Sequence, residues 1–121
     1  MELSELSKER LVGVDERLKA VVIETAARCW FPFNVSEGLR SREKQREYYN
    51  AGKSKTMNSK HLIGKAVDLY PLTMNRRKVD WSRFDDLADL MKEVAKEKEV
   101  EIVWGGDWKT FVDKPHFEIP Y

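Results

Sequence analysis

Apolar residues recur at helical spacing in the N-terminal part of the chain, where they would form one face of an amphipathic helix: Leu11, Val14, Leu18, Val21 and Val22. This pattern predicts a helix over residues 7–29. Gly13 weakens the prediction near its start, because glycine disfavours a helix interior, and Asp15 is an alternative start for a second helix.

A second helical stretch lies in the C-terminal half, with its apolar positions again on one face: Phe84, Leu87, Leu90, Met91, Val94 and Ala95. Ser82 and Asp85 have the spacing of a capping box, so we expect a helix that begins there and reaches about Lys98. A shorter helix is predicted from Ser41, a good N-cap residue, through Tyr49.

The remaining apolar segments are short and bounded by glycine, proline or polar residues, which is typical of strands: residues 30–36, 65–70, 100–104 and 116–119. Residues 53–60 are polar and small and predict a loop. There are no repeats, low-complexity tracts or linkers. The pattern favours an α+β fold in which a small, largely antiparallel sheet packs with helices in one domain over residues 1–121.

Composition agrees with a globular domain, since the 121 residues are 41% hydrophobic and 36% charged. No apolar run is long enough for membrane insertion, and the N-terminus lacks the apolar core of a signal peptide, so we expect a cytoplasmic protein. The single cysteine, Cys29, excludes an internal disulfide and is expected to be a buried, inert thiol.

The net charge of +1 gives no footprint for nucleic acid, but the charge is distributed unevenly. Residues 37–65 hold eight Lys or Arg and three Glu, whereas residues 80–101 hold eight Asp or Glu and four Lys or Arg. A basic rim beside a site would attract an anionic substrate. Two solvated helical faces explain the same counts equally well.

The first candidate site residues are His61 and Asp68, which flank Gly64. Their odd separation would point them to opposite faces of one straight strand, but a turn at Gly64 lets His61 approach from the preceding loop. Asp68 stands between Val67 and Leu69 in an apolar run, so its carboxylate needs a cation or hydrogen-bond donors.

His116 is the only other histidine, and it also lies in a short apolar strand. Three protein ligands of nitrogen and oxygen type, with a fourth position open to water, are typical of a catalytic zinc site. Zinc lowers the pKa of its bound water to roughly 7, and a nearby carboxylate can then act as the base. The alternative is that each histidine is an ordinary residue of the core.

Three acids compete for the role of general base. Asp113 precedes His116 by three residues, with Pro115 between them, so both side chains could face a metal. Glu118 follows His116 by two residues and shares its face in a regular strand, while Asp107 follows a Gly-Gly turn. Spacing favours Asp113 but leaves the other two open.

The sequence resembles the zinc D-Ala-D-Ala carboxypeptidase and dipeptidase family, and most of all its L-alanyl-D-glutamate endopeptidases, which are single-domain endolysins of tailed phages. The family signature of Ser, His, Gly, Ala and Asp is matched from Ser59 to Asp68. Residues 37–41 resemble the family's arginine segment, and residues 104–108 with 115–118 resemble its closing segment. The likeness extends from about Leu6 to Tyr121 and implies a hedgehog/D-Ala-D-Ala-peptidase-like fold.

The resemblance implies a role for each site residue. His61, Asp68 and His116 would bind one Zn²⁺ per chain, and Asp113, in the position where some members carry Glu, would be the catalytic acid. Arg40 would bind substrate and stabilise the oxyanion, for which the fixed donors of a guanidinium are suited. Ser59 would hydrogen-bond the substrate. Glu118 and Asp107 would then be structural, and Arg42 and Arg46 solvated.

The implied function is that of a zinc metallopeptidase, an endolysin that cuts the L-alanyl-D-glutamate bond of peptidoglycan stem peptides. Such a monomer would reach the wall from the host cytoplasm through a membrane lesion, and we expect no separate cell-wall-binding module. The alternatives are a D-Ala-D-Ala carboxypeptidase or dipeptidase, and a binding module that keeps the metal but has lost catalysis.

Overall fold

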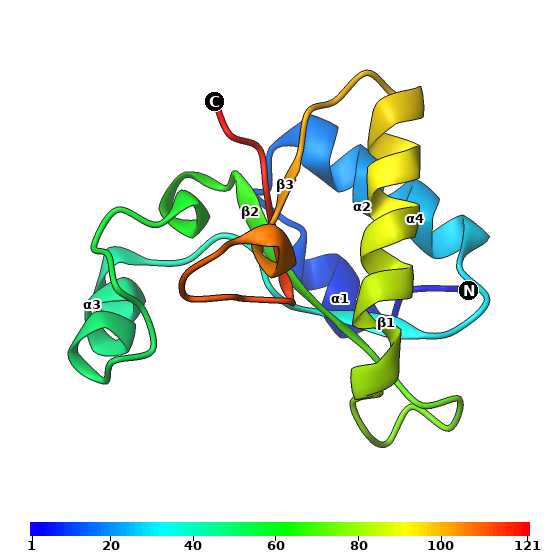
Figure 1. Cartoon of the computed structure of the whole chain (residues 1–121), viewed down its shortest axis with the longest axis horizontal. Coiled ribbons are helices and arrows are strands. Elements are labelled where there is room, and N and C mark those ends of the chain that lie inside the picture. The colour runs from blue at the N-terminus through cyan, green and yellow to red at the C-terminus, as the bar shows by residue number, and fades with distance from the viewer.

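Four short strands form one antiparallel sheet in the order β1–β2–β4–β3. They are β1 (Phe33–Glu37), β2 (Ala66–Pro71), β3 (Val103–Trp104) and β4 (His116–Glu118). The computed structural model describes all 121 residues and places helices on both sides of this sheet (Figure 1). The predicted α+β class with a small antiparallel sheet is confirmed.

The N-terminal helical stretch is divided into α1 (Glu5–Arg10) and α2 (Glu16–Arg28), so the prediction of one continuous helix is wrong. Gly13 adopts a φ of 85° between them, in the left-handed region that glycine tolerates. The alternative start at Asp15 is confirmed, because its side chain accepts a hydrogen bond from the backbone N–H of Arg17 at 2.9 Å.

The C-terminal helix α4 (Phe84–Glu97) matches the predicted helix except at its start. The expected capping box of Ser82 and Asp85 is absent. Asp80 caps instead, since its Oδ1 accepts from the N–H of Ser82 at 3.1 Å and begins the short 3-10 helix η2 (Trp81–Arg83). Asp80 is the better acceptor because its carboxylate is charged.

Two predicted strands differ from the observed ones by more than one residue at an end, whereas β2 and β4 differ by one residue at most. β1 covers residues 33–37 rather than 30–36, and β3 consists of two residues only. The chain leaving α4 explains the second difference, because Glu99 has a φ of 58° and the N–H of Val100 bonds to the carbonyl of Ala95. Residues 98–100 therefore close the helix and are not available to the strand.

The core lies between the sheet and the pair α2 and α4, which contact each other on one side of it (Figure 1). Cys29 is a buried free thiol there, as predicted, and burial raises its pKa. On the other side of the sheet lie α3 (Arg42–Asn50) and the segment that leads to the 3-10 helix η1 (Lys60–Ile63). No helix has the length and apolar character needed to cross a bilayer.

Candidate metal centre

Asp68 lies at the centre of the site because of its position in β2. The sheet register places His116 of β4 directly opposite Asp68 on one side and Glu37 of β1 opposite it on the other. Asp68 Oδ1 is 3.4 Å from His116 Nδ1. Directly opposed residues of an antiparallel pair have neighbouring Cβ atoms, so β-sheet pairing alone brings these groups together.

An irregularity in β1 aims Glu37 at the site. The register with β2 shifts between Val35 and Glu37, as at a β-bulge, with Ser36 as the extra residue. In a regular strand Glu37 would share the buried face of Val35, but here Ser36 and Glu37 both line the cleft. The hydroxyl of Ser36 donates to the backbone carbonyl of Asp68 at 3.3 Å.

His61 reaches the same point from η1. Ser59 caps this 3-10 helix by accepting from the N–H of His61 at 3.2 Å, and Gly64 ends it with a φ of 71°. A Cβ atom at Gly64 would lie 2.3 Å from the carbonyl oxygen of Gly13, so the close approach also requires glycine there. The turn that the sequence predicted at Gly64 is therefore present.

The ring of His61 is held at both nitrogens. Nδ1 is 2.8 Å from the carbonyl oxygen of Gly38, and Nε2 is 3.2 Å from Asp68 Oδ1. The ring of His116 is held similarly, with Nε2 2.7 Å from Glu118 Oε1 and Nδ1 facing Asp68. Each histidine thus turns one nitrogen toward Asp68 while a carbonyl or carboxylate fixes the other, as around protein-bound metals.

The three candidate ligand atoms, one each from His61, Asp68 and His116, all lie within 4.8 Å of one another. Two imidazole nitrogens and a carboxylate oxygen are borderline-hard donors suited to zinc and similar divalent cations. Both rings are at least nine-tenths buried, so few water molecules compete for these donors. The residues present therefore fit a metal ion.

The electrostatics of the cluster favour a positive charge at this point. Burial alone would lower the pKa of His116, but hydrogen bonds to Asp68 and Glu118 raise it to about 9. Burial alone would raise the pKa of Asp68, but hydrogen bonds to His116 and His61 hold it below its usual value. The protein thus supplies negative potential that either a proton or a cation can satisfy.

Asp113 stands beside the cluster at the base of the loop that leads to β4. Its N–H bonds to the carbonyl of Gly105 at 3.0 Å, and its own carbonyl accepts from the N–H of His116 at 3.1 Å. The carboxylate lines the cleft, where burial and the charge of Asp68 raise its pKa. A carboxylate with a raised pKa is suited to carrying a proton.

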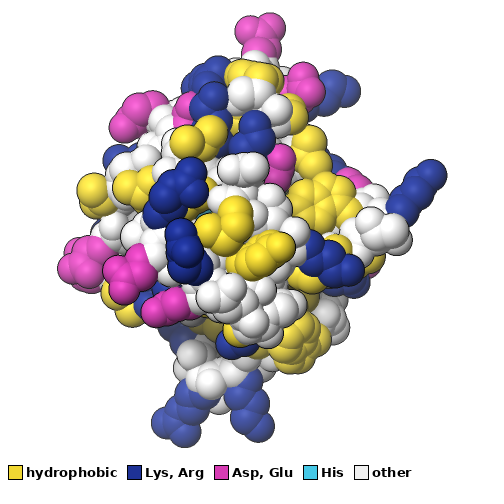
Figure 2. Space-filling model, turned by 90° about the vertical axis from the view of Figure 1, so that its left-hand side faces the viewer, with side chains coloured by type: hydrophobic (Ala, Val, Ile, Leu, Met, Phe, Trp, Pro, Cys, Tyr) yellow, Lys and Arg dark blue, Asp and Glu magenta, His cyan; other side chains and the backbone are white.

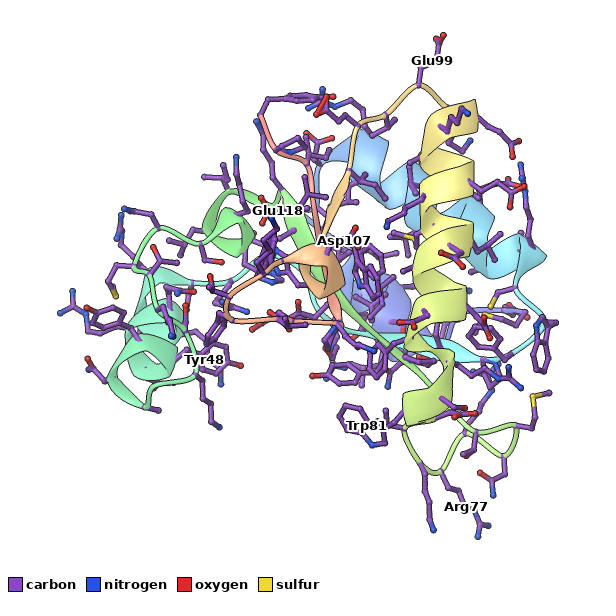
Figure 3. The ribbon with its side chains drawn as sticks, viewed as in Figure 1. Tyr48, Arg77, Trp81, Glu99, Asp107 and Glu118 are labelled. Carbon is purple, nitrogen blue, oxygen red and sulfur yellow. The ribbon has the colours of Figure 1, made fainter.

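The two competing acids have other partners. Glu118 also lines the cleft, but its carboxylate is occupied by the ring of His116. Asp107 does not line the cleft and forms an ion pair with Lys92 at 2.7 Å, and Figure 3 shows it at the outer turn that follows β3. The geometry therefore leaves Asp113 as the cleft acid without a fixed partner.

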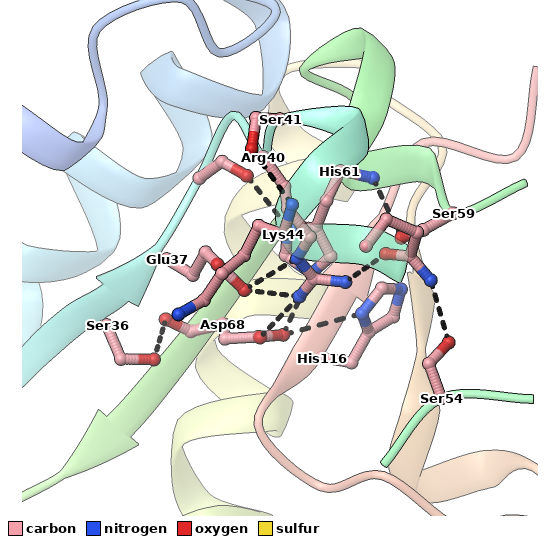
Figure 4. A network of polar contacts seen from close by, with 12 residues as sticks. Ser36, Glu37, Arg40, Ser41, Lys44, Ser54, Ser59, His61, Asp68 and His116 are labelled. Carbon is pink, nitrogen blue, oxygen red and sulfur yellow. Dashed lines mark hydrogen bonds and ion pairs between the residues drawn. The ribbon is translucent and has the colours of Figure 1, made fainter. Parts of the chain in front are cut away.

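Arg40 is buried in a polar network that Figure 4 shows from close by. Nε and Nη2 both donate to Glu37, and Nη1 donates to Gln45 Oε1 at 2.6 Å. Nη2 also lies 3.7 Å from Asp68 Oδ2, and the guanidinium stacks on the ring of Tyr48 at 4.6 Å. The three hydrogen bonds engage all three guanidinium nitrogens, so the orientation of the group is fixed.

The cleft that contains the cluster has a volume of about 930 Å³. It brings together all six residues to which the resemblance assigns metal binding, catalysis or substrate binding: Arg40, Ser59, His61, Asp68, Asp113 and His116. Sequence reasoning missed Glu37, Tyr48, Tyr70 and Trp108, which also line it. Tyr70 had a detectable signal, because it follows Asp68 by two residues in a strand and must share its face.

Trp108 packs against the ring of His116, with the centroids 5.1 Å apart, and so restricts its orientation. Nothing in the local sequence indicates this contact, because it joins a loop to a strand. The same applies to Tyr48, which lies on the side of α3 toward the rest of the molecule (Figure 3). Both aromatic residues reach the cleft only once α3 and the loop after β3 have taken their places in the fold.

Comparison with known proteins gives consistent matches. The profile of the phage L-alanyl-D-glutamate peptidase family matches residues 1–119. An L-alanyl-D-glutamate peptidase of Listeria phage A118 is 40% identical over 88 residues, 72% of this chain and 30% of the relative. The peptidoglycan L-alanyl-D-glutamate endopeptidase CwlK of Bacillus subtilis (strain 168) is 32% identical over 99 residues, 70% of this chain and 59% of the relative.

Both of these relatives are longer than this chain, which spans about a third of one and three fifths of the other. A solved structure covers more of both molecules. The crystal structure of the Serratia marcescens L-Ala D-Glu endopeptidase ChiX has a TM-score of 0.89 and 37% sequence identity, over 98% of this chain and 90% of that one.

Proposed function

Because the chain belongs to the phage L-alanyl-D-glutamate peptidase family, we propose that it is a zinc metallopeptidase that hydrolyses the L-alanyl-D-glutamate bond of peptidoglycan stem peptides. The observation that carries this proposal is the convergence of His61, Asp68 and His116 beside an unpaired carboxylate in one cleft. The family also favours a monomer made in the host cytoplasm and released to the wall through a membrane lesion.

His61, Asp68 and His116 would hold one zinc ion per chain, with Nε2 of His61 and Nδ1 of His116 as the nitrogen donors. When bound there, zinc supplies Lewis acidity, which polarises the scissile carbonyl and lowers the pKa of water. Glu118 and the carbonyl of Gly38 keep the two rings in the orientation that the ion requires.

Asp113 is the general base in this proposal. Its carboxylate takes a proton from the attacking water and passes it to the nitrogen of the leaving D-glutamate, so one group serves both halves of the reaction. The raised pKa of Asp113 supports this role, because a carboxyl that holds a proton more strongly is a better base and still returns it to an amine.

Arg40 stabilises the oxyanion that develops on the L-alanine carbonyl oxygen. Glu37, Gln45 and Tyr48 hold its guanidinium in place before substrate arrives, so little reorganisation accompanies the reaction. Ser59 donates its hydroxyl proton to the substrate. That proton is free for the purpose, because the hydroxyl oxygen accepts, and does not donate, in its bond to the N–H of His61.

The test is digestion of purified sacculi, followed by mass spectrometry of the new peptide ends. We expect peptides that begin with D-glutamate, L-alanine retained on the glycan strands and no free D-alanine. Removing the metal with a chelator should abolish cleavage and zinc should restore it. Hydrolysis of D-Ala-D-Ala with intact sacculi would overturn the proposal, and so would zinc binding without any cleavage.

A further inference from the structure

Lysine side chains line the outer part of the cleft without acidic partners. Lys53, Lys55 and Lys109 are exposed, and none forms an ion pair with a carboxylate. The carboxylates of Glu37, Asp68 and Glu118 lie further in, where Arg40 and the histidines occupy them. The cleft is therefore polarised, with its uncompensated positive charge on the outside.

These lysines come from two loops that approach each other across the cleft. Lys53 and Lys55 follow α3, and Lys109 lies in the loop between Gly105 and Asp113. Nζ of Lys55 lies 5.4 Å from the ring centroid of Phe111 in the second loop. Figure 2 views the molecule from the α3 side and shows Lys and Arg side chains spread over this face with hydrophobic ones among them.

Phe111 is held at the tip of its loop in an unusual conformation. Its φ of 50° lies in the left-handed region, which a bulky non-glycine residue rarely adopts, and its side chain is 41% exposed. A bond from the N–H of Asp113 to the carbonyl of Gly105 closes the base of the loop. Strained residues of this kind gather at ligand-binding sites, where the rest of the fold maintains them.

We propose that Lys55 and Lys109 form a subsite for the free carboxylates of the stem peptide on the leaving-group side of the scissile bond. This inference rests on the proposed function. D-glutamate continues the stem peptide through its side-chain carboxyl group, so its α-carboxylate is free and lies next to the bond that breaks. The following diamino acid carries a further free carboxylate when it is diaminopimelate.

The positive charge and the long side chains of Lys55 and Lys109 both suit the binding of a carboxylate. An exposed cation–π contact such as that of Lys55 with Phe111 is weak, so an incoming carboxylate replaces the ring as the partner of the ammonium group. Lysines on opposite loops can then hold the substrate from both sides of the cleft. Long, flexible side chains at the rim improve capture of the substrate rather than the chemical step.

The test compares four synthetic stem peptides with one enzyme and two variants. The peptides carry D-glutamate or D-isoglutamine, each followed by diaminopimelate or lysine, so each free carboxylate is varied alone. The double variant Lys55→Gln/Lys109→Gln removes the subsite. The matched control is Lys78→Gln, because Lys78 is an exposed, unpaired lysine away from the cleft.

For the D-glutamate peptides, the double variant should raise KM by about 10-fold and leave kcat nearly unchanged, as expected for two partly exposed ion pairs. If the KM increase caused by the double variant disappears only when D-isoglutamine replaces D-glutamate, the subsite binds the α-carboxylate of D-glutamate. If it disappears only when lysine replaces diaminopimelate, the subsite binds the carboxylate of diaminopimelate. The same KM change with every peptide, or none, overturns the subsite while cleavage itself continues. If the unaltered enzyme cuts none of the peptides, the proposed function fails instead.

Discussion

The two faces of β2 have opposite compositions and opposite tasks. On the face toward α2 and α4, Val67 and Leu69 are fully buried in the apolar core. On the other face, Asp68 and Tyr70 line a cleft filled with charged and polar groups. Consecutive residues of β2 therefore face the apolar core and the candidate metal centre in turn.

The comparison shows how such a small fold can hold several carboxylates close together. The apolar face supplies favourable free energy, roughly 1.5–3 kcal/mol for each fully buried aliphatic side chain. The polar face gathers Glu37, Asp68, Asp113 and Glu118 around one point, which is unfavourable unless cations compensate them. Substitutions on the first face should therefore change stability, and substitutions on the second should change chemistry.

The largest effect on activity is expected for His61→Ala and His116→Ala. Each removes one of the three proposed ligands, so zinc content measured by elemental analysis should fall and the rate should drop by about 10³-fold or more. Circular dichroism should show the fold intact, because the apolar face is unchanged. Full zinc occupancy in both variants would contradict the ligand assignment.

Asp113→Asn should distinguish loss of the proposed general base from loss of a metal ligand. Asparagine has the same size but accepts no proton, so zinc should stay bound while kcat falls by about 10²-fold to 10⁴-fold.

Glu118→Gln is the matched control for Asp113→Asn. Because Glu118 orients His116, it should weaken zinc binding by about 10-fold to 100-fold, and excess zinc should restore most of the rate. A Glu118→Gln enzyme that stays inactive at saturating zinc, beside an active Asp113→Asn enzyme, would mean that the base is Glu118.

Arg40→Lys should have a smaller effect, with kcat reduced by about 10-fold to 10³-fold, because a single ammonium group replaces a fixed fork of donors. It also leaves Glu37 and Gln45 with fewer partners, so some loss of thermal stability should accompany it. Arg42→Lys is the control, since Arg42 is exposed at the start of α3. Equal losses at both positions would indicate a general electrostatic role.

Leu69→Ala tests the other face of the strand and should have the smallest effect on catalysis. The cavity it creates should lower the free energy of unfolding by about 2–5 kcal/mol, measured by denaturant titration. The kcat of the folded protein, assayed at low temperature, should stay close to that of the unaltered enzyme. A large loss of kcat without a loss of stability would show that the two faces are not independent.

Local patterns in the sequence were sufficient for the elements that carry the site. The alternation around Asp68 predicted β2, Ser41 predicted the start of α3, and the glycine at position 64 predicted the turn that presents His61. The resemblance supplied the same six residues that the cleft brings together. Their individual roles remain predictions that the substitutions above would test.

Contacts between distant segments were not predictable in the same way. The shifted register at Ser36 that aims Glu37 toward Arg40 depends on how β1 pairs with β2, and nothing in residues 33–37 specifies it. The break between α1 and α2 was ambiguous because one glycine competed with a continuous apolar stripe. The approach of Trp108 to His116 needs the loop after β3 to fold back over the sheet.

The pairing of Asp68 with His116 predicts that the proposed metal site forms late in refolding. The two residues are distant in the chain, and their strands become neighbours only when a long loop closes, which is entropically unfavourable and slows folding. A nascent sheet without β4 would have only part of the proposed ligand set, so tight zinc uptake would have to wait for this strand to dock. In a stopped-flow experiment, the rate of zinc capture would therefore report directly on the closing step of folding.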